Sequence, residues 1–262
     1  MLHTTPAGNP VYIEGDGPTV VLVHGVLMDH RMWREQVKSL CTSYRVVCMN
    51  MLGHGLAPNP PGPRKLDDFV AQAREVITDV CGDEHPVLVG FSMGGMVVQA
   101  YAIKYSHELR GLMIMNAVYN RNAAERDSVA VRLRNLECGG IRGMEGPARA
   151  RWFREDEKDE YPDEIDEMIS WLYDGDPDAK TKAYRVFATS DAETAGRLKE
   201  IACPTLVMTG DGDAGSPPHM SEAMAREIPN AQLKIFQRQQ HMMLVLDADH
   251  VSRTMREFLD AL

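Results

Sequence analysis

Residues 86–101 read PVLVGFSMGGMVVQAY, and this stretch decides the fold. A short apolar run, 86–89, precedes the pattern G-x-S-x-G at Gly90–Gly94, and an apolar helical pattern, 95–101, follows it. A nucleophile elbow requires this order of strand, sharp turn and helix. The turn strains the backbone of its serine, and the flanking glycines let strand and helix approach closely. We therefore predict that Ser92 is a nucleophile, presented above a sheet at the N-terminus of a helix.

A serine hydroxyl is a poor nucleophile at neutral pH unless a base removes its proton, and that base needs an orienting acid. Among the nine histidines, His241 follows a strand-like run, 233–236, after a short loop. It therefore comes last in the chain order Ser, Asp, His. His24 and His54 lie in H-G and G-H-G loops, which we expect them to position. The sequence thus predicts His241 as the base.

The orienting acid is expected at the end of the strand before that histidine. The letters T-G-D-G-D follow the run 206–208 and offer two carboxylates, Asp211 and Asp213. The position after another strand-like run, 112–115, holds Asn116, whose neutral amide would stabilise an imidazolium poorly. Both aspartates remain candidates on the residues alone, although Asp211 would also suit a turn position.

A tetrahedral intermediate needs two N–H donors aimed at its oxyanion. Met93, the residue after the serine, supplies one backbone N–H. The second is expected from the loop after the first central strand, at His24-Gly25-Val26, where Val26 is the predicted donor. These are backbone roles, so the side chains at Val26 and Met93 carry little information about them.

Alternating strand-like and helical patterns surround this centre. Short β-branched runs separated by helical patterns indicate βα units and a mostly parallel sheet. Helical spacing of apolar residues predicts a helix over 66–81, and Ser216-Pro217 suits the start of another, with Ser as N-cap and Pro first in the helix. A last amphipathic helix is expected over 249–262. The predicted strands are 20–23, 46–49, 87–89, 112–115, 206–208 and 233–236.

The alternation stops between residues 119 and 200, where no strand-like run occurs and charged helical stretches dominate. We interpret 119–200 as an inserted helical cap, and 1–118 with 201–262 as one α/β core. The cap contains an acidic run, 154–167, with nine carboxylates against Arg154 and Lys158. Such a run typically forms a solvated surface.

Composition limits the classes of partner. The 262 residues are 44% apolar and 25% charged, as in ordinary globular proteins, with no apolar run long enough to span a membrane. A formal charge of −10 argues against nucleic acid and anionic membrane surfaces as partners. Five widely spaced cysteines lack the spacing of a zinc site or a disulfide framework. The N-terminus lacks the features of a signal peptide, so a cytoplasmic location is expected.

With these motifs in place, the whole chain resembles the α/β-hydrolase superfamily. The resemblance implies that Asp213 is the acid, because a strand end, Gly210, two residues and then Asp is the arrangement known from these hydrolases. Within the superfamily the chain is similar to 3-oxoadipate enol-lactonases and their relatives. The residues that carry the two resemblances are Val21–Gly25, Gly53–Gly55, Gly90–Gly95, Pro204–Val207 with Gly210 and Asp213, and His241, then Asp29–Trp33, Arg151–Phe153 and Ser216–Pro218.

Three features depart from this pattern. Gln240 replaces the usual Gly before the histidine and is expected to narrow the space beside it, and Asn50 stands where many members have Asp. The acidic cap would disfavour a lactone derived from a dicarboxylate, unless an arginine such as Arg134 or Arg151 faces inward.

The leading hypothesis is a serine hydrolase that cleaves a small-molecule carboxylic ester or lactone through an acyl-enzyme. Serine would supply the nucleophile and water the second substrate, so neither metal nor organic cofactor is implied. The alternatives are a C–C bond hydrolase or cofactor-free perhydrolase with the same residues, or a small-molecule receptor on a hydrolase fold. Apolar cap positions also leave a homodimer open. The candidates for the acyl pocket are Phe91, Trp152 and Met28, with Trp33 and Phe153.

Overall fold

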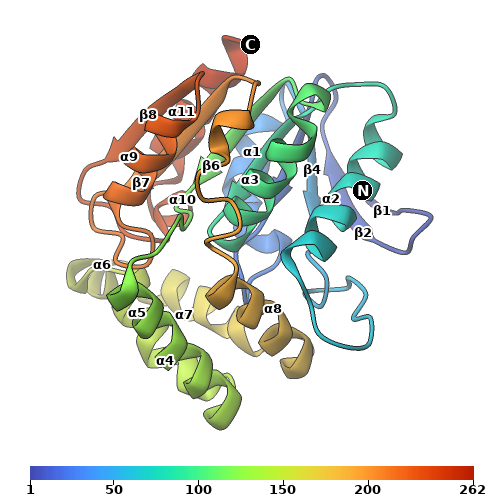
Figure 1. The fold of residues 1–262 in the computed structure, drawn as a ribbon. Helices are drawn as coiled ribbons and strands as arrows, with labels where there is room; N and C mark the ends of the chain where they lie inside the picture. The colour runs from blue at the N-terminus through green and yellow to red at the C-terminus, as the bar shows by residue number, and fades with distance from the viewer.

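One eight-stranded sheet forms the centre of the protein. The computed structural model describes residues 1–262, with the strand order β1-β2-β4-β3-β5-β6-β7-β8 and helices on both faces (Figure 1). β2 pairs antiparallel with β1 and β4, and all other pairs are parallel. The α/β-hydrolase fold class is confirmed. The strands are β1 (Leu2–Thr4), β2 (Pro10–Glu14), β3 (Thr19–Val23), β4 (Arg45–Met49), β5 (Val87–Phe91), β6 (Gly111–Met115), β7 (Thr205–Gly210) and β8 (Ala231–Phe236).

The six predicted strands correspond to β3–β8. Every residue of β3, β5, β6 and β7 is buried, because helices cover both faces of a parallel sheet. The sequence interpretation missed β1 and β2. β1 has three residues and none is buried, while β2 begins with Pro10, so neither strand carries the continuous apolar run of a central strand.

Two helical layers enclose the sheet. α1 and α11 pack together on one face, and α2 packs on α3 on the other (Figure 1). α2 has the predicted bounds, and the residues of its predicted apolar stripe are buried. The helices of this core are η1 (His30–Trp33), α1 (Arg34–Leu40), α2 (Leu66–Cys81), α3 (Met93–Tyr105), η2 (Ser106–Glu108), η4 (Leu198–Glu200), α9 (Pro218–Glu227), α10 (Met243–Leu246) and α11 (Ala248–Asp260).

The start of α9 differs from the prediction by one residue. Pro217 is the N-cap and Pro218 the first helical residue, so Ser216 does not cap the helix. The Ser216 hydroxyl donates instead to the backbone oxygen of Asn116, at 2.6 Å. This hydrogen bond joins the loop after β7 to the loop after β6. None of the helices combines the length and apolar content needed to cross a membrane.

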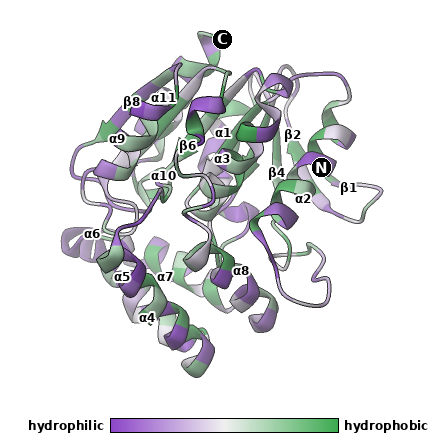
Figure 2. Ribbon diagram, viewed as in Figure 1, coloured by the Kyte–Doolittle hydropathy of each residue, from purple (hydrophilic) through white to green (hydrophobic).

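Between β6 and β7 the chain forms no strand, and the helices from α4 to α8 are here called the helical segment. It lies beyond the carboxyl ends of the strands, below the sheet in Figure 1. In Figure 2, hydrophilic stretches alternate with hydrophobic ones along α4 and α8, whereas the strands are mostly hydrophobic. A buried ion pair between Arg121 and Asp191, at 3.1 Å, joins the two ends of the segment. Its helices are α4 (Ala123–Gly139), α5 (Arg142–Trp152), α6 (Glu155–Glu160), α7 (Pro162–Ser170), η3 (Trp171–Tyr173) and α8 (Pro177–Thr189).

Candidate active site

The turn between β5 and α3 has the strained geometry of a nucleophile elbow. Ser92 has φ 55° and ψ −113°, a region that residues with a side chain rarely adopt. Its backbone N–H donates to the oxygen of Met115, at 2.9 Å, which fixes the turn to β6. The Ser92 hydroxyl makes no hydrogen bond to protein and lines a pocket. The serine is therefore held by its backbone while its side chain is left free.

The two glycines of the motif are required by close backbone contacts. A Cβ on Gly90 would lie 2.3 Å from the oxygen of Gly94. A Cβ on Gly94 would lie 2.2 Å from the oxygen of Val23. Both distances are far below van der Waals contact, so only glycine lets α3 approach β3 and β5 this closely.

Asp213 lies in the loop after β7, with its carboxylate saturated by hydrogen bonds. Its Oδ1 accepts the backbone N–H groups of Gly215, at 2.8 Å, and Ser216, at 3.0 Å. Its Oδ2 accepts Asn116 Nδ2, at 2.9 Å, and lies 2.7 Å from His241 Nδ1. The residue is 1% exposed. These contacts fix the carboxylate and its partner imidazole in one orientation.

Asn116 thus lies beside the acid rather than in place of it. This residue occupies the alternative acid position after β6, and its amide donates to Asp213. Its φ of 47° turns the chain sharply out of the sheet. Asp211, the other candidate acid, is exposed and accepts the backbone N–H of Gln239, at 3.2 Å. Asp211 therefore has the turn role and makes no contact with His241.

His241 is packed between two aromatic rings. The Phe91 ring centroid lies 4.8 Å from that of the imidazole, and the Trp152 ring stacks on it at 6.3 Å and 22°. His241 and Ser92 line the same pocket, although no hydrogen bond joins them in this unliganded arrangement. Such bonds are often long until a substrate is bound. Gln240, expected to narrow this space, does not line the pocket and instead faces Gly212.

Two backbone N–H groups are free beside the serine. Val26, in the loop after β3, donates its N–H to no protein acceptor. Met93 is the first residue of α3, so its N–H has no partner within the helix. The backbone of neighbouring Leu27, with φ 68°, is held at both of its polar groups. Its N–H donates to His54 Nε2, at 3.1 Å, and its oxygen accepts Lys180 Nζ, at 3.3 Å.

The two loop histidines act as buried hydrogen-bond acceptors. Burial lowers the pKa of His24 to about 4, and it lowers the pKa of His54 well below its ordinary value. Both imidazoles are therefore neutral at pH 7. The Nε2 atom of His24 accepts the backbone N–H of Met51, at 2.9 Å, and the Nε2 atom of His54 accepts that of Leu27. Asn50 holds a third loop residue, accepting the N–H of His30 at 2.8 Å.

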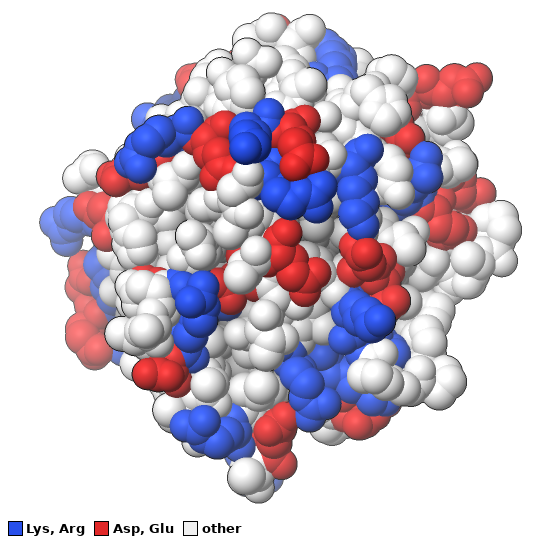
Figure 3. Space-filling model, viewed as in Figure 1, with Lys and Arg blue, Asp and Glu red and all other residues white.

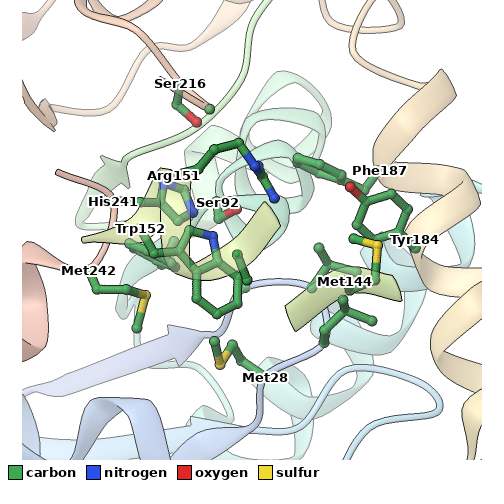
Figure 4. A pocket seen from close by; sticks show the side chains of 16 residues that line it. Met28, Ser92, Met144, Arg151, Trp152, Tyr184, Phe187, Ser216, His241 and Met242 are labelled. Atoms are coloured by element: carbon green, nitrogen blue, oxygen red, sulfur yellow. The ribbon is translucent and has the colours of Figure 1, made fainter. Parts of the chain in front are cut away.

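The pocket over Ser92 is small, apolar and built from both the core and the helical segment. Its free volume is about 30 Å³. Figure 4 shows the side chains that line it. Trp33 and Phe153, offered as pocket candidates by the sequence, do not line it: Trp33 packs edge-on to Phe91 and Phe153 to Trp152. Met28, Phe91 and Trp152 do line it, together with residues that the sequence did not indicate, namely Met144, Ala148, Tyr184, Phe187 and Met242.

One charged arginine and no carboxylate lines this pocket. Arg151 faces inward from α5, whereas Arg134, the other arginine considered, is exposed on α4. The acidic run 154–167 forms α6 and part of α7 and does not reach the pocket. Its buried member, Glu157, pairs with Arg154 at 2.7 Å. Figure 3 shows basic and acidic side chains interspersed over one face of the molecule.

Comparison with known proteins agrees with the fold and the motifs. The profile described as "Alpha/beta hydrolase family" matches residues 20–261. The (E)-2-((N-methylformamido)methylene)succinate hydrolase of Acinetobacter baylyi is 30% identical over 248 residues, 94% of this chain and 92% of that protein. The 3-oxoadipate enol-lactonase 2 of the same species is 21% identical over 239 residues, 91% of this chain and 84% of that protein.

A solved structure is similar over the full chain. The thermophilic esterase from Thermogutta terrifontis, determined with malate bound, superposes with a TM-score of 0.87 and is 26% identical, covering 100% of this chain and 98% of that one. The enol-lactonase from Burkholderia xenovorans LB400 superposes with a TM-score of 0.86 at 21% identity, over 99% and 100% of the two chains. The family profile spans most of the sequence, and the chain therefore belongs to the alpha/beta hydrolase family.

Proposed function

We propose that this protein is a serine hydrolase that cleaves a carboxylic ester or lactone of a small molecule through an acyl-enzyme. The observation that carries the proposal is the hydrogen bond at 2.7 Å between buried Asp213 and His241, which lines the same pocket as the strained Ser92. A serine hydroxyl, an imidazole and a buried carboxylate in this order are the groups that nucleophilic acyl transfer needs.

In the acylation step, Ser92 Oγ attacks the substrate carbonyl and His241 Nε2 takes the serine proton. The tetrahedral intermediate collapses when His241 returns this proton to the leaving oxygen, and the acyl group stays on Ser92. Asp213 holds Nδ1 protonated, so that Nε2 is free to act as the base, and it stabilises the imidazolium. Its four hydrogen bonds hold the carboxylate in place.

In the second step water replaces the alcohol. His241 activates a water molecule, which attacks the acyl carbon and releases the acid with Ser92 restored. The free N–H groups of Val26 and Met93 would bind the oxyanion in both steps, because neither has a partner to give up. His54 and Lys180 would keep the Val26 N–H in place, because they bind the backbone of the next residue, Leu27.

The relatives support this reaction class. Two of them are named as an enol-lactonase and an esterase, and a third as a hydrolase of a substituted succinate. The helical segment would act as the cap of such an enzyme, since α5 and α8 provide the wall opposite Ser92. The cavity of about 30 Å³ would need to widen to admit a substrate, and its methionines are flexible enough to move aside.

The test is release of acid, followed in a pH-stat, across enol-lactones, saturated lactones and short-chain esters. Wild type is compared with Ser92→Ala, and with Ser170→Ala as the matched control, because Ser170 is exposed on α7. We expect turnover in wild type and Ser170→Ala and none in Ser92→Ala. Equal turnover in Ser92→Ala, or no turnover of any substrate, would overturn the proposal.

A further inference from the structure

We propose that Arg151 is the anion-binding residue of this pocket and that the substrate carries a carboxylate besides the group that is cleaved. The inference rests on the proposed function, because it names the substrate class of the same site. It follows from the position of one guanidinium, from the absence of a protein partner for it, and from the residues around it.

Arg151 lies in the last turn of α5 and reaches into the pocket that holds Ser92 (Figure 4). Its Nε donates to the oxygen of Pro147, at 3.0 Å, within its own helix. The terminal nitrogens make neither a hydrogen bond nor an ion pair with any residue of the protein. One of them, Nη1, would lie 3.7 Å from a Cβ on Gly215, so the guanidinium lies against the loop that follows Asp213.

The lack of a carboxylate partner for Arg151 is unusual in this chain, because acidic residues outnumber basic ones by 38 to 28. The other half-buried or buried guanidinium groups of the helical segment have partners in the protein. Arg121 pairs with Asp191 and Arg154 with Glu157, while Arg132 donates to hydroxyl groups. Arg151 is left without one beside a pocket that no carboxylate lines. The nearby Asp213 cannot serve, because both of its oxygens are already occupied by four hydrogen bonds.

An unpaired guanidinium in an apolar pocket is energetically unfavourable. Burial, and then the charge of Arg132, lower the pKa of Arg151 to about 10, which still leaves it protonated at neutral pH. A charge removed from water is tolerated when a group of opposite charge pairs with it. A substrate carboxylate would supply that partner, and the planar guanidinium can bind both carboxylate oxygens at once.

Tyr184, on α8, provides a second donor to the pocket. Its hydroxyl accepts a hydrogen bond from Arg132 Nε, at 3.3 Å, which leaves the hydroxyl proton free to be donated. Arg151 and Tyr184 both point into the pocket in Figure 4, with Phe187 beside them. A bound carboxylate would therefore have one charged and one neutral donor, while the rest of the wall contacts only apolar parts of the substrate.

The experiment compares two activated esters that differ in charge. 4-Nitrophenyl hemisuccinate carries the carboxylate, and 4-nitrophenyl pentanoate replaces it with an ethyl group. We expect Arg151→Met to lower kcat/KM for the hemisuccinate by about 10–100-fold and to change kcat/KM for the pentanoate by less than about three-fold. Arg151→Lys should recover part of the loss, because lysine keeps the positive charge but cannot bind both carboxylate oxygens with a planar group. Arg134→Met, on the exposed face of α4, should change neither.

Calorimetric titration with succinate gives a readout that needs no turnover. Wild type and Arg134→Met should bind succinate, and Arg151→Met should bind it at least about 10-fold more weakly. An equal loss of kcat/KM on both esters, or succinate affinity that is unchanged in Arg151→Met, would overturn the role of Arg151. Succinate binding that depends on Arg151 in a protein that hydrolyses neither ester would keep the anion site and overturn the proposed hydrolase function instead.

Discussion

The carboxyl edge of the sheet and the helical segment contribute to the same pocket in different ways. At the sheet edge, backbone geometry places the chemistry: a strained turn holds Ser92, backbone N–H groups fix Asp213, and no glycine of the elbow has room for a Cβ. In the helical segment, side chains such as Trp152 and Arg151 form the wall. Under the proposed function, the core would set the reaction class and the segment the choice of substrate.

The largest expected effect separates the two aspartates of the T-G-D-G-D loop. Asp213→Asn should lower kcat by about 10⁴-fold, because a neutral amide neither holds the correct imidazole tautomer nor stabilises the imidazolium. Asp211→Asn is the matched control and should stay within about three-fold of wild type, since Asp211 is exposed and makes no contact with His241. Steady-state kinetics on the best ester measures both. Equal losses would mean that the sheet edge does not place the acid as described.

The same substitution in both regions tests the contrast in backbone packing. Gly94→Ala should lower the free energy of unfolding by at least about 3 kcal/mol, because its Cβ would lie 2.2 Å from the oxygen of Val23. Gly146→Ala, within α5, should raise it by about 0.5–1 kcal/mol, because nothing lies within 4 Å of its Cβ and alanine favours a helix. Urea unfolding measures both, and a destabilised Gly146→Ala would contradict the open packing described for α5.

Buried neutral histidines should make the core sensitive to acid. The pKa of His24 is about 4, below the value of about 6.5 for an exposed histidine. Between these values the unfolded chain binds more protons, so stability is full above pH 6.5 and is lost as the pH falls toward 4. From pH 7 to pH 5 this residue should lower the free energy of unfolding by about 2 kcal/mol. In His24→Leu, the free energy of unfolding should depend less on pH by this amount, as measured by urea unfolding at pH 7 and pH 5. The same pH dependence in both proteins would refute the role of His24.

The smallest effect concerns the segment. Trp152→Phe removes part of the pocket wall and should shift the preference among acyl chains by about 10-fold, the scale of a changed apolar contact, while kcat for short esters stays within about three-fold. A panel of esters with increasing acyl length measures the shift. A fall in kcat of more than about 10³-fold for every ester would show that the stacking of Trp152 on His241 belongs to the chemistry and not to substrate choice.

The contrast between the regions also explains what could be predicted from the sequence. The sharp turn at Ser92 and the six parallel strands β3–β8 could be predicted. A strained turn demands glycines, and parallel strands that are buried, as β5 is, demand continuous apolar runs. β1 and β2 were missed, since β1 has only three residues and β2, which begins with Pro10 and ends with Glu14, lacks a continuous apolar run. The start of α9 was one residue off, because Ser216 is used in a contact with Asn116, which no local pattern reveals.

The helical segment was harder to interpret residue by residue. Only two residues of α4 are buried, and α5 buries one narrow stripe of Met144, Ala148 and Trp152, so apolar periodicity says little about the charged residues beside it. The sequence therefore could not tell whether Arg134 or Arg151 faces the pocket. Trp33 and Phe153 were proposed as lining on aromatic character alone, yet both pack within the core. Side-chain direction in such a segment is decided by tertiary packing.

The central claim is that the sheet edge activates Ser92, and labelling with a phosphonofluoridate tests it most directly. The protein is incubated with the reagent, digested, and its peptides analysed by mass spectrometry. We predict one phosphonyl group per chain, on Ser92, and labelling at least about 10³-fold slower in Asp213→Asn. A Ser92 that stays unlabelled, or one that reacts at the same rate in Asp213→Asn, would contradict the account.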